Sequence, residues 1–264
     1  GRLFYFYDEG PLGLLDTRFP ERWQLIARDA FSGQLLWKKP MPDWGWRQWE
    51  DSGPMMNQLG PIVGLWSIPY STNRRLVAAG DELFVTLGYR THLSVLDAAT
   101  GAVKGEFKDV HDVDEVLLKD GVLLLSVREI PRRSQELGSK KAEDFMKEFK
   151  ETLRPGRVVA MQADTGKVLW EAPAKAMSPE TLATANGRVC YYDYHDVVAL
   201  DFQTGEELWR TPAQPLMWKG FYQRRAGGVL MMTGDLVFFS RLGCLSAKDG
   251  NLLWNAPAGG SPKV

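Results

Sequence analysis

Short apolar runs alternate with polar turns along the whole chain, and one such pattern occurs five times. Each copy has an apolar run, a small or acidic residue, a polar turn that ends in glycine, and a second strand-forming run. The copies are LIARDAFSGQLLW (25–37), LSVLDAATGAVKG (93–105), VVAMQADTGKVLW (158–170), VVALDFQTGEELW (197–209) and GCLSAKDGNLLW (243–254). Two β-forming runs joined by a tight glycine turn predict a β-hairpin. We therefore predict hairpins over 25–39, 93–107, 158–173, 197–212 and 243–257.

Two positions of the repeat are fixed. The first is the turn glycine, which adopts the positive φ of a short loop at little cost: Gly33, Gly101, Gly166, Gly205 and Gly250. The second lies four residues later and is tryptophan in four copies: Trp37, Trp170, Trp209 and Trp254. The second copy has Gly105 there. A large ring repeated at one structural position predicts packing between neighbouring units.

Further strand-like runs precede the hairpins. Residues 182–186 and 188–194 stand before the fourth hairpin, and residues 228–233 and 235–241 stand before the fifth. Four antiparallel strands per unit, repeated at a spacing of about 40 residues, are typical of a β-propeller blade. The sequence therefore predicts an all-β fold, a β-propeller of four-stranded antiparallel blades. About five blades are visible, and residues 1–264 form one propeller domain or part of one.

The string ALDFQTGEELW (Ala199–Trp209) resembles the PQQ-like repeat, which occurs in quinoprotein dehydrogenases and in BamB-like propellers. Four of the five copies carry the family's tryptophan, and the units cover nearly the whole chain. The resemblance implies that each tryptophan docks against the adjacent blade. It also implies a periplasmic or exported protein, and that complete rings of this family usually have seven or eight blades.

The ends of the chain bear on ring closure. Residues 1–7 (GRLFYFY) align with residues 187–193 (GRVCYYD), the second strand of their blade. We therefore expect the chain to open inside a blade without its innermost strand, as an excised part of a longer propeller. The alternative is a five-bladed ring closed by the tail 258–264. Uncovered edges on the end blades of an open arc favour self-association.

Three insertions interrupt the repeat, at 8–22, 40–73 and 131–157. They join either the second and third strands of a blade or the last strand to the next blade. Antiparallel alternation puts both kinds of connection on one face of the disc, opposite the tight glycine turns. Long loops on one face of a rigid scaffold are where binding residues usually lie. We therefore expect a binding scaffold that presents loops to a protein or envelope partner.

The second insertion contains a candidate binding loop, MPDWGWRQWE, with Trp44, Trp46, Arg47 and Trp49. Exposed, these side chains suit a sugar ring, a peptide or a protein partner, because tryptophan and arginine dominate binding hot spots. The alternative is that the rings cover the propeller core. In the third insertion, Ala142–Leu153 predicts a short helix, and residues 131–157 hold eight basic and five acidic residues. That helix either rests on the disc or docks a partner.

Charge and chemistry exclude several function classes. A net charge of −1 argues against a nucleic-acid partner, and no apolar run is long enough to span a bilayer as a helix. His111 and His195 stand beside carboxylates, but polar turn residues explain both without a metal. Cys190 and Cys244 are not adjacent, so the paired-cysteine ring of quinoprotein alcohol dehydrogenases is absent. We predict no catalytic residue, no metal site and no cofactor.

Two alternatives remain beside the non-catalytic scaffold. The chain could be part of a quinoprotein oxidoreductase, and PQQ with Ca²⁺ is implied only in that case. It could also be a carbohydrate-binding propeller that uses the Trp44, Trp46 and Trp49 loop.

Overall fold

The computed structural model describes residues 1–10, 21–45, 70–89, 91–128, 155–213, 228–240 and 242–255. Within these ranges the regular structure is β-strand, apart from one short 3-10 turn, η3 (Tyr70–Arg74). The chain divides into two compact units. The described part of the first unit lies within Gly1–Val116, and that of the second lies within Leu117–Arg128 and Arg154–Val264.

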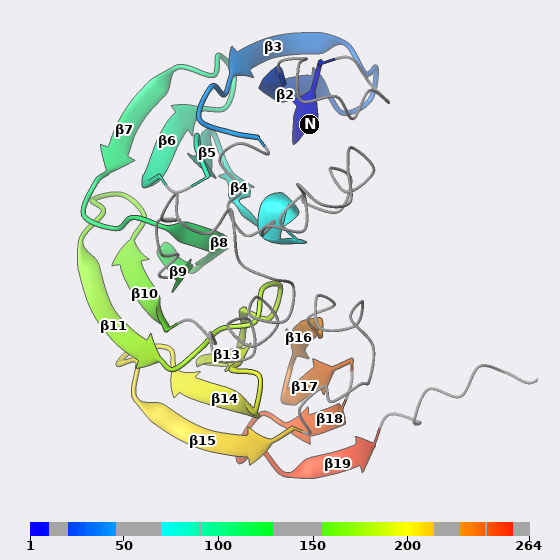
Figure 1. Cartoon of the computed structure of the whole chain (residues 1–264), viewed down its shortest axis with the longest axis vertical. Helices are drawn as coiled ribbons and strands as arrows, with labels where there is room; N and C mark the ends of the chain where they lie inside the picture. Colours follow the sequence, from blue (N-terminus) through cyan, green and yellow to red (C-terminus); the bar gives the residue numbers. More distant parts are fainter. Residues whose placement is uncertain are drawn as a thin grey trace, which may run out of the picture. The chain divides into compact units, whose positions relative to one another are not determined.

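The first unit contains two antiparallel sheets (Figure 1). One has three strands in the order β1-β2-β3, and the other has four in the order β4-β5-β6-β7. The strands are β1 (Arg2–Asp8), β2 (Trp23–Asp29), β3 (Leu35–Pro40), β4 (Leu76–Ala79), β5 (Glu82–Thr86), β6 (Leu93–Asp97) and β7 (Val103–Phe107). A further strand, β8 (Val113–Lys119), begins in the first unit and ends in the second.

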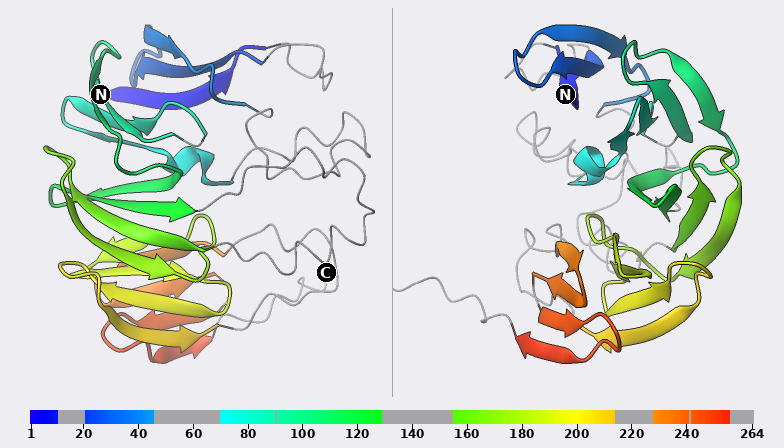
Figure 2. Two further views of the ribbon diagram at one scale, coloured as in Figure 1. Left: turned by 60° about the vertical axis from the view of Figure 1, so that its left-hand side comes forward. Right: turned by 180° about the vertical axis from the view of Figure 1, so that it is seen from behind.

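The remaining sheets have the orders β11-β10-β9-β8, β12-β13-β14-β15 and β16-β17-β18-β19. Their strands are β9 (Val122–Arg128), β10 (Gly156–Gln162), β11 (Val168–Ala174), β12 (Ala183–Ala185), β13 (Arg188–Tyr192), β14 (Asp196–Asp201), β15 (Glu207–Pro212), β16 (Leu230–Thr233), β17 (Leu236–Phe239), β18 (Gly243–Ser246) and β19 (Leu252–Asn255). Strands β12 and β13 contact β16, and their two sheets lie side by side in both views of Figure 2.

These sheets resemble propeller blades, which confirms the predicted all-β fold class. Each predicted hairpin is present, as β2-β3, β6-β7, β10-β11, β14-β15 and β18-β19. The first sheet has three described strands, and β1 pairs with β2 as β13 pairs with β14. This matches the sequence alignment of residues 1–7 with residues 187–193. The helix predicted over Ala142–Leu153 lies outside the described residues.

All five hairpin turns have the same backbone hydrogen bonds. In the fourth, the Asp201 N–H donates to Glu206 O and the Gly205 N–H donates to Asp201 O. The five turn glycines have φ between 71° and 75°, in the left-handed region that favours glycine. Asp201 Oδ1 also accepts the N–H groups of Gln203 and Thr204. The predicted aspartate-closed turn is therefore present there, and the same arrangement recurs at Asp29 and Asp97.

These hydrogen bonds stabilise the ionised carboxylates. The Thr204 amide, followed by the Gln203 amide, holds the pKa of Asp201 below its ordinary value. The Thr100 side chain and amide lower the pKa of Asp97. A lowered folded-state pKa contributes stability that is fully present above the unfolded pKa of about 3.9 and is lost as pH falls through the folded value.

We therefore expect acid to destabilise the chain partly through these turns. The melting temperature of the wild type should fall below about pH 4 more steeply than that of an Asp97→Asn, Asp201→Asn variant, because asparagine does not titrate. The measurement is thermal unfolding at pH values between neutrality and strong acid. Parallel pH profiles for the two proteins would contradict the assignment.

Three of the repeated tryptophans dock on the next hairpin turn of their own unit. The indole N–H groups of Trp37, Trp170 and Trp209 donate to Ala98 O, Phe202 O and Ala247 O, at 3.2, 3.0 and 2.9 Å. Each ring also covers the glycine of that turn. A Cβ added at Gly101, Gly205 or Gly250 would lie within 2.8 Å of a ring carbon. The turn glycine therefore provides both a positive φ and the space for the neighbouring ring.

Two glycines separate these roles experimentally. Gly33 and Gly205 have φ of 71° and 75°, but a Cβ at Gly33 meets no described atom within 4 Å, whereas one at Gly205 meets Trp170 at 2.5 Å. Gly33→Ala should lower the free energy of unfolding by about 1–2 kcal/mol through the backbone alone. Gly205→Ala should cost on the order of 1–3 kcal/mol more, because the ring must move. Chemical denaturation measures both, and equal losses would refute the second role.

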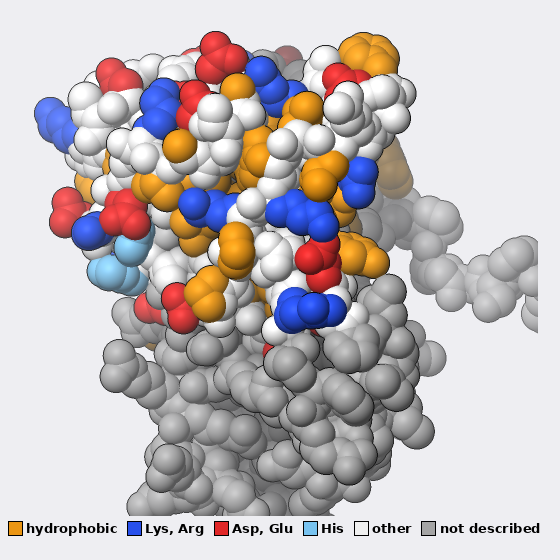
Figure 3. Space-filling model, turned by 90° about the horizontal axis from the view of Figure 1, so that it is seen from above, with side chains coloured by type: hydrophobic (Ala, Val, Ile, Leu, Met, Phe, Trp, Pro, Cys, Tyr) orange, Lys and Arg blue, Asp and Glu red, His pale blue; other side chains and the backbone are white. Residues whose placement is uncertain are grey.

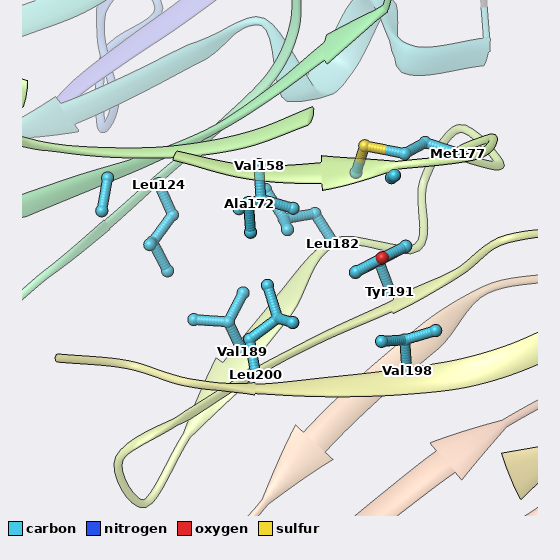
Figure 4. Close-up of a cluster of buried hydrophobic side chains, with 11 residues drawn as sticks. Leu124, Val158, Ala172, Met177, Leu182, Val189, Tyr191, Val198 and Leu200 are labelled. Carbon is cyan, nitrogen blue, oxygen red and sulfur yellow. The ribbon is translucent and has the colours of Figure 1, made fainter. Parts of the chain in front are cut away.

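The cores lie between facing sheets. Figure 4 shows one in the second unit, where Val158 and Ala172 from β10 and β11 face Val189 and Val198 from β13 and β14. Trp170 packs against the same cluster. Both faces of these inner strands are therefore buried, which explains why they read as continuous apolar runs in the sequence.

Candidate functional site at the loop end of the first unit

The two ends of each sheet in the first unit differ. One end carries the tight turns at Gly33 and Gly101, and the other carries the longer connections and is called the loop end here. At the loop end, Asp43, which follows β3, bridges to Gly88, which follows β5. The Tyr89 N–H donates to Asp43 O at 3.0 Å. The described start of the second insertion is therefore attached to the neighbouring sheet.

Trp44 lies at the centre of an aromatic cluster at this end. Its ring stacks on Phe6 with centroids 5.1 Å apart, and it meets the edges of Tyr89 and Trp23 at 6.2 and 6.5 Å. Only 3% of Trp44 is exposed, and it belongs to the core cluster of Leu25 and its neighbours. Trp44 therefore covers the core, as the alternative interpretation of the loop expects, and its ring offers no open face to a ligand.

Arg75 is buried against this cluster. Its guanidinium carbon lies 4.7 Å from the centroid of Tyr89 and 5.4 Å from that of Trp44. One guanidinium nitrogen donates to Tyr89 O and to Val113 O, at 2.7 and 2.9 Å, and another donates to the carboxylate of Asp114. Both side chains of the Arg75–Asp114 ion pair are 1% exposed. Arg75 thus ties the loop end to the start of β8 through charge and hydrogen bonds.

A second ion pair lies next to the first. Arg74 Nη1 lies 3.2 Å from the carboxylate of Glu115, whose side chain is 1% exposed. Two arginines and two carboxylates therefore balance in charge at this end, so the burial of each carboxylate is compensated by a nearby cation. Sequence reasoning missed both arginines, because each is separated from its partner by about 40 residues and neither belongs to a local motif.

The remaining residues of the candidate binding loop differ from Trp44, because the structure does not describe them. Trp46, Arg47 and Trp49 lie outside the described residues, as do the basic side chains of 131–154 in the third insertion. Their role in binding therefore stays a proposal. Burial of Trp44 removes one of the three rings on which the carbohydrate alternative depended.

In the second unit, the β13-β14 connection forms a charged cluster. Asp193 accepts the N–H groups of His195 and Asp196, which closes the turn. Arg210 on β15 pairs with Asp193, Asp196 and Glu207. These carboxylates, Glu207 first, raise the pKa of Arg210 above its ordinary value. His195 thus occupies a turn closed by aspartate, as expected for a polar turn residue.

The remaining histidines lie together at the loop end of the first unit. The rings of His92 and His111 meet edge to face with centroids 5.9 Å apart, and His92 Nε2 lies 3.4 Å from Glu106. Asp114, three residues after His111 in the sequence, forms its ion pair with Arg75 instead. Across the described residues, no group of three or more His, Cys, Asp or Glu side chains is arranged to hold a metal ion.

Both cysteines are free and buried, on β13 and β18. Burial raises the pKa of the Cys190 thiol to about 12, so it behaves as a small apolar side chain. The adjacent-cysteine ring expected beside a quinone does not fit these two positions. The two cysteines therefore do not form the adjacent pair of the dehydrogenase alternative.

Comparison with known proteins identifies the repeat. The family model described as outer membrane protein assembly factor BamB matches residues 152–264. Over these residues, which are less than half of the chain, the sequence is similar to that family of PQQ-like repeats. The first two hairpins have the same turn hydrogen bonds, and Trp37 of the first hairpin docks on the turn of the second. The structural repeat therefore continues through the first unit. No curated protein shows significant sequence similarity to the chain.

Solved structures show that this chain has a propeller fold. BamB from Moraxella catarrhalis is 14% identical with a TM-score of 0.50, over 91% of this chain and 59% of that one. The quinohemoprotein alcohol dehydrogenase from Comamonas testosteroni is 12% identical with a TM-score of 0.52, over 90% of this chain and 42% of that one. The chain therefore spans less than two thirds of either protein. At these identities the likeness concerns the fold alone.

Proposed function

We propose that this PQQ-like repeat chain is a non-catalytic binding module of the cell envelope, which presents long loops to a protein partner. The observation that carries the proposal is the unequal length of the connections. The hairpin turns hold only a few residues, whereas the β1-β2, β3-β4, β9-β10 and β15-β16 connections are all much longer. Antiparallel order brings these longer connections to the loop ends of their sheets, where function usually resides.

Two further observations support a scaffold. The loop end of the first unit is closely packed, because Trp44 and Arg75 are buried and Arg75 donates to two backbone carbonyls. The matching family model is described as an outer membrane protein assembly factor. On this basis we propose that the chain lies in the periplasm or outside the cell, with a component of outer-membrane protein assembly as its partner. Among the described residues, no helix is long and apolar enough to cross a bilayer.

In-cell photo-crosslinking tests this function. A photoreactive amino acid replaces Trp46 or Trp49 in the second insertion, and the matched controls carry it at Ala99 or Gln203 in the tight turns. We expect the insertion variants to crosslink to an outer-membrane assembly protein, identified by mass spectrometry, and the turn variants to give no such product. Equal products from both ends, or none from the insertion, would overturn the proposal.

The quinoprotein alternative is kept because of the fold shared with the Comamonas testosteroni enzyme. Titration with PQQ, with and without Ca²⁺, tests it through tryptophan fluorescence. We expect no saturable quenching, because the described residues lack the adjacent cysteines and a group of metal ligands. Ca²⁺-dependent quenching that saturates at micromolar quinone would instead establish the oxidoreductase reading.

A further inference from the structure

The second sheet of the first unit ends in a strand with an open edge. Its order is β4-β5-β6-β7, so β7, its outer strand, pairs with β6 on one side. Among the described residues, no strand pairs with the other side of β7. The sheet lies in the interior of the sequence, since β3 precedes it and β8 follows it. An open edge presents backbone N–H and C=O groups to which a further strand can bind.

Two features that protect other outer strands from such pairing are missing in β7. Proline, which has no N–H to donate, occurs in β3, β11 and β15 as Pro40, Pro173 and Pro212, but not in β7. The docking tryptophan of those strands is replaced by Gly105, and a Cβ added there would meet no atom within 4 Å. All five hairpins have the same bulge at the start of this strand, so the bulge does not distinguish β7. A second strand can therefore approach the middle of β7 closely.

The side chains of β7 are complementary to those of a second copy of β7. In an antiparallel pair centred on Gly105, Lys104 of each copy faces Glu106 of the other, and Val103 faces Phe107. The Lys104 and Glu106 side chains are 46% and 36% exposed, and Val103 is 45% exposed. Opposite charges that face each other across two strands stabilise the pair, and so do apolar side chains. The strand thus offers two ion pairs and two apolar pairs to its own copy.

Both charged side chains are ionised at neutral pH and have exposed partners. Lys108, followed by His92, lowers the pKa of Glu106, and Glu82 raises the pKa of Lys104. Figure 3 shows this kind of surface on the first unit, where histidine side chains lie beside acidic and basic ones. Exposed ion pairs contribute little to stability, so these side chains can change partners at small cost.

We propose that two copies of the chain pair through β7 in antiparallel order, with Gly105 on the two-fold axis, so that their sheets join into one. The occupant is a second copy because the charges of Lys104 and Glu106 are complementary to themselves about Gly105. Such a contact is isologous, so it closes as a dimer. A single short strand buries less surface than a stable dimer interface does, and we therefore expect a weak dimer. This proposal goes beyond the proposed binding of an envelope partner and does not rest on it.

Charge reversal tests this register. Lys104→Glu makes both facing pairs acidic, and Glu106→Lys makes both basic, so each variant should self-associate about tenfold or more weakly than the wild type. The matched control is Glu171→Lys on β11, which follows Trp170 as Glu106 follows Gly105, and it should associate as the wild type does. Sedimentation equilibrium over a wide concentration range measures association, and circular dichroism confirms folding.

Mixing the two variants gives the sharpest outcome. A Lys104→Glu strand facing a Glu106→Lys strand again has opposite charges at both pairs, so the mixture should form dimers as the wild type does. The double variant Lys104→Glu, Glu106→Lys should recover self-association without a partner variant. A wild type that stays monomeric up to millimolar concentration would overturn the proposal. So would single variants that associate as the wild type does, or a mixture that stays monomeric.

Discussion

Replacing Trp209 by alanine should lower the free energy of unfolding by about 3–5 kcal/mol, the usual cost of truncating a buried aromatic side chain. The ring covers Gly250, and its N–H donates to Ala247 O at 2.9 Å. It also packs against the core cluster that contains Val237 and Phe239. The variant therefore loses apolar contact, leaves a cavity and removes the hydrogen bond to the next turn. Chemical denaturation of the second-unit transition measures the loss.

Trp254→Ala is the matched control, because it removes the same side chain at the same repeat position. Its ring is 51% exposed. The expected change is about 0.5 kcal/mol or less, as for most surface substitutions. Equal losses for the two variants would mean that the tryptophan stabilises its own hairpin rather than the junction with the next one.

Arg75→Ala should cost about 3–5 kcal/mol, because it leaves the Asp114 carboxylate buried without its cation. It also removes the donors to Tyr89 O and Val113 O and the cation that lies against Trp44 and Tyr89. The second copy of the repeat has Gly105 where the others have tryptophan, so no docking ring supports the first unit at that position. We expect the first unit to unfold earlier in denaturant, with little change in the second.

A double replacement distinguishes the charge from the packing. Arg75→Met with Asp114→Leu removes both charges and keeps most of the side-chain volume. Such replacements are often neutral, but here the two carbonyls bonded to Arg75 lose their donor. We therefore expect a loss smaller than that of Arg75→Ala but still measurable. A double variant as unstable as Arg75→Ala would show that packing, and not the buried charge, decides the effect.

The sequence predicts the hairpins and the docking tryptophans well because their causes are local. The segment occurs five times, with the turn glycine in every copy, the preceding aspartate in three copies and the tryptophan four residues after the glycine in four. Trp37, Trp170 and Trp209 meet the turns that the repeat leads one to expect. The alignment of residues 1–7 with residues 187–193 also predicts that β1 has the place of a second strand.

The loop end is harder to predict because its interactions join residues that are distant in the sequence. Arg75 and Asp114 are 39 residues apart, and neither local sequence alone indicates that both charges are buried. In MPDWGWRQWE, no periodicity tells a core ring from an exposed one, since a loop has no fixed faces. Trp44 is buried because Phe6 on β1 and Tyr89 in the connection after β5 pack against it.

The tryptophan-to-turn contact also makes the stability of the chain a nearest-neighbour property. Each contact joins one sheet to the next one along the chain. The free energy of unfolding is then the sum of the intrinsic stability of each sheet and the stability of each interface between neighbours, as in a one-dimensional Ising model. It should therefore be possible to insert a consensus four-stranded repeat, with both the turn glycine and the tryptophan, between two existing sheets. Cooperativity should then grow with the number of units, and a single lost ring should divide one unfolding transition into two.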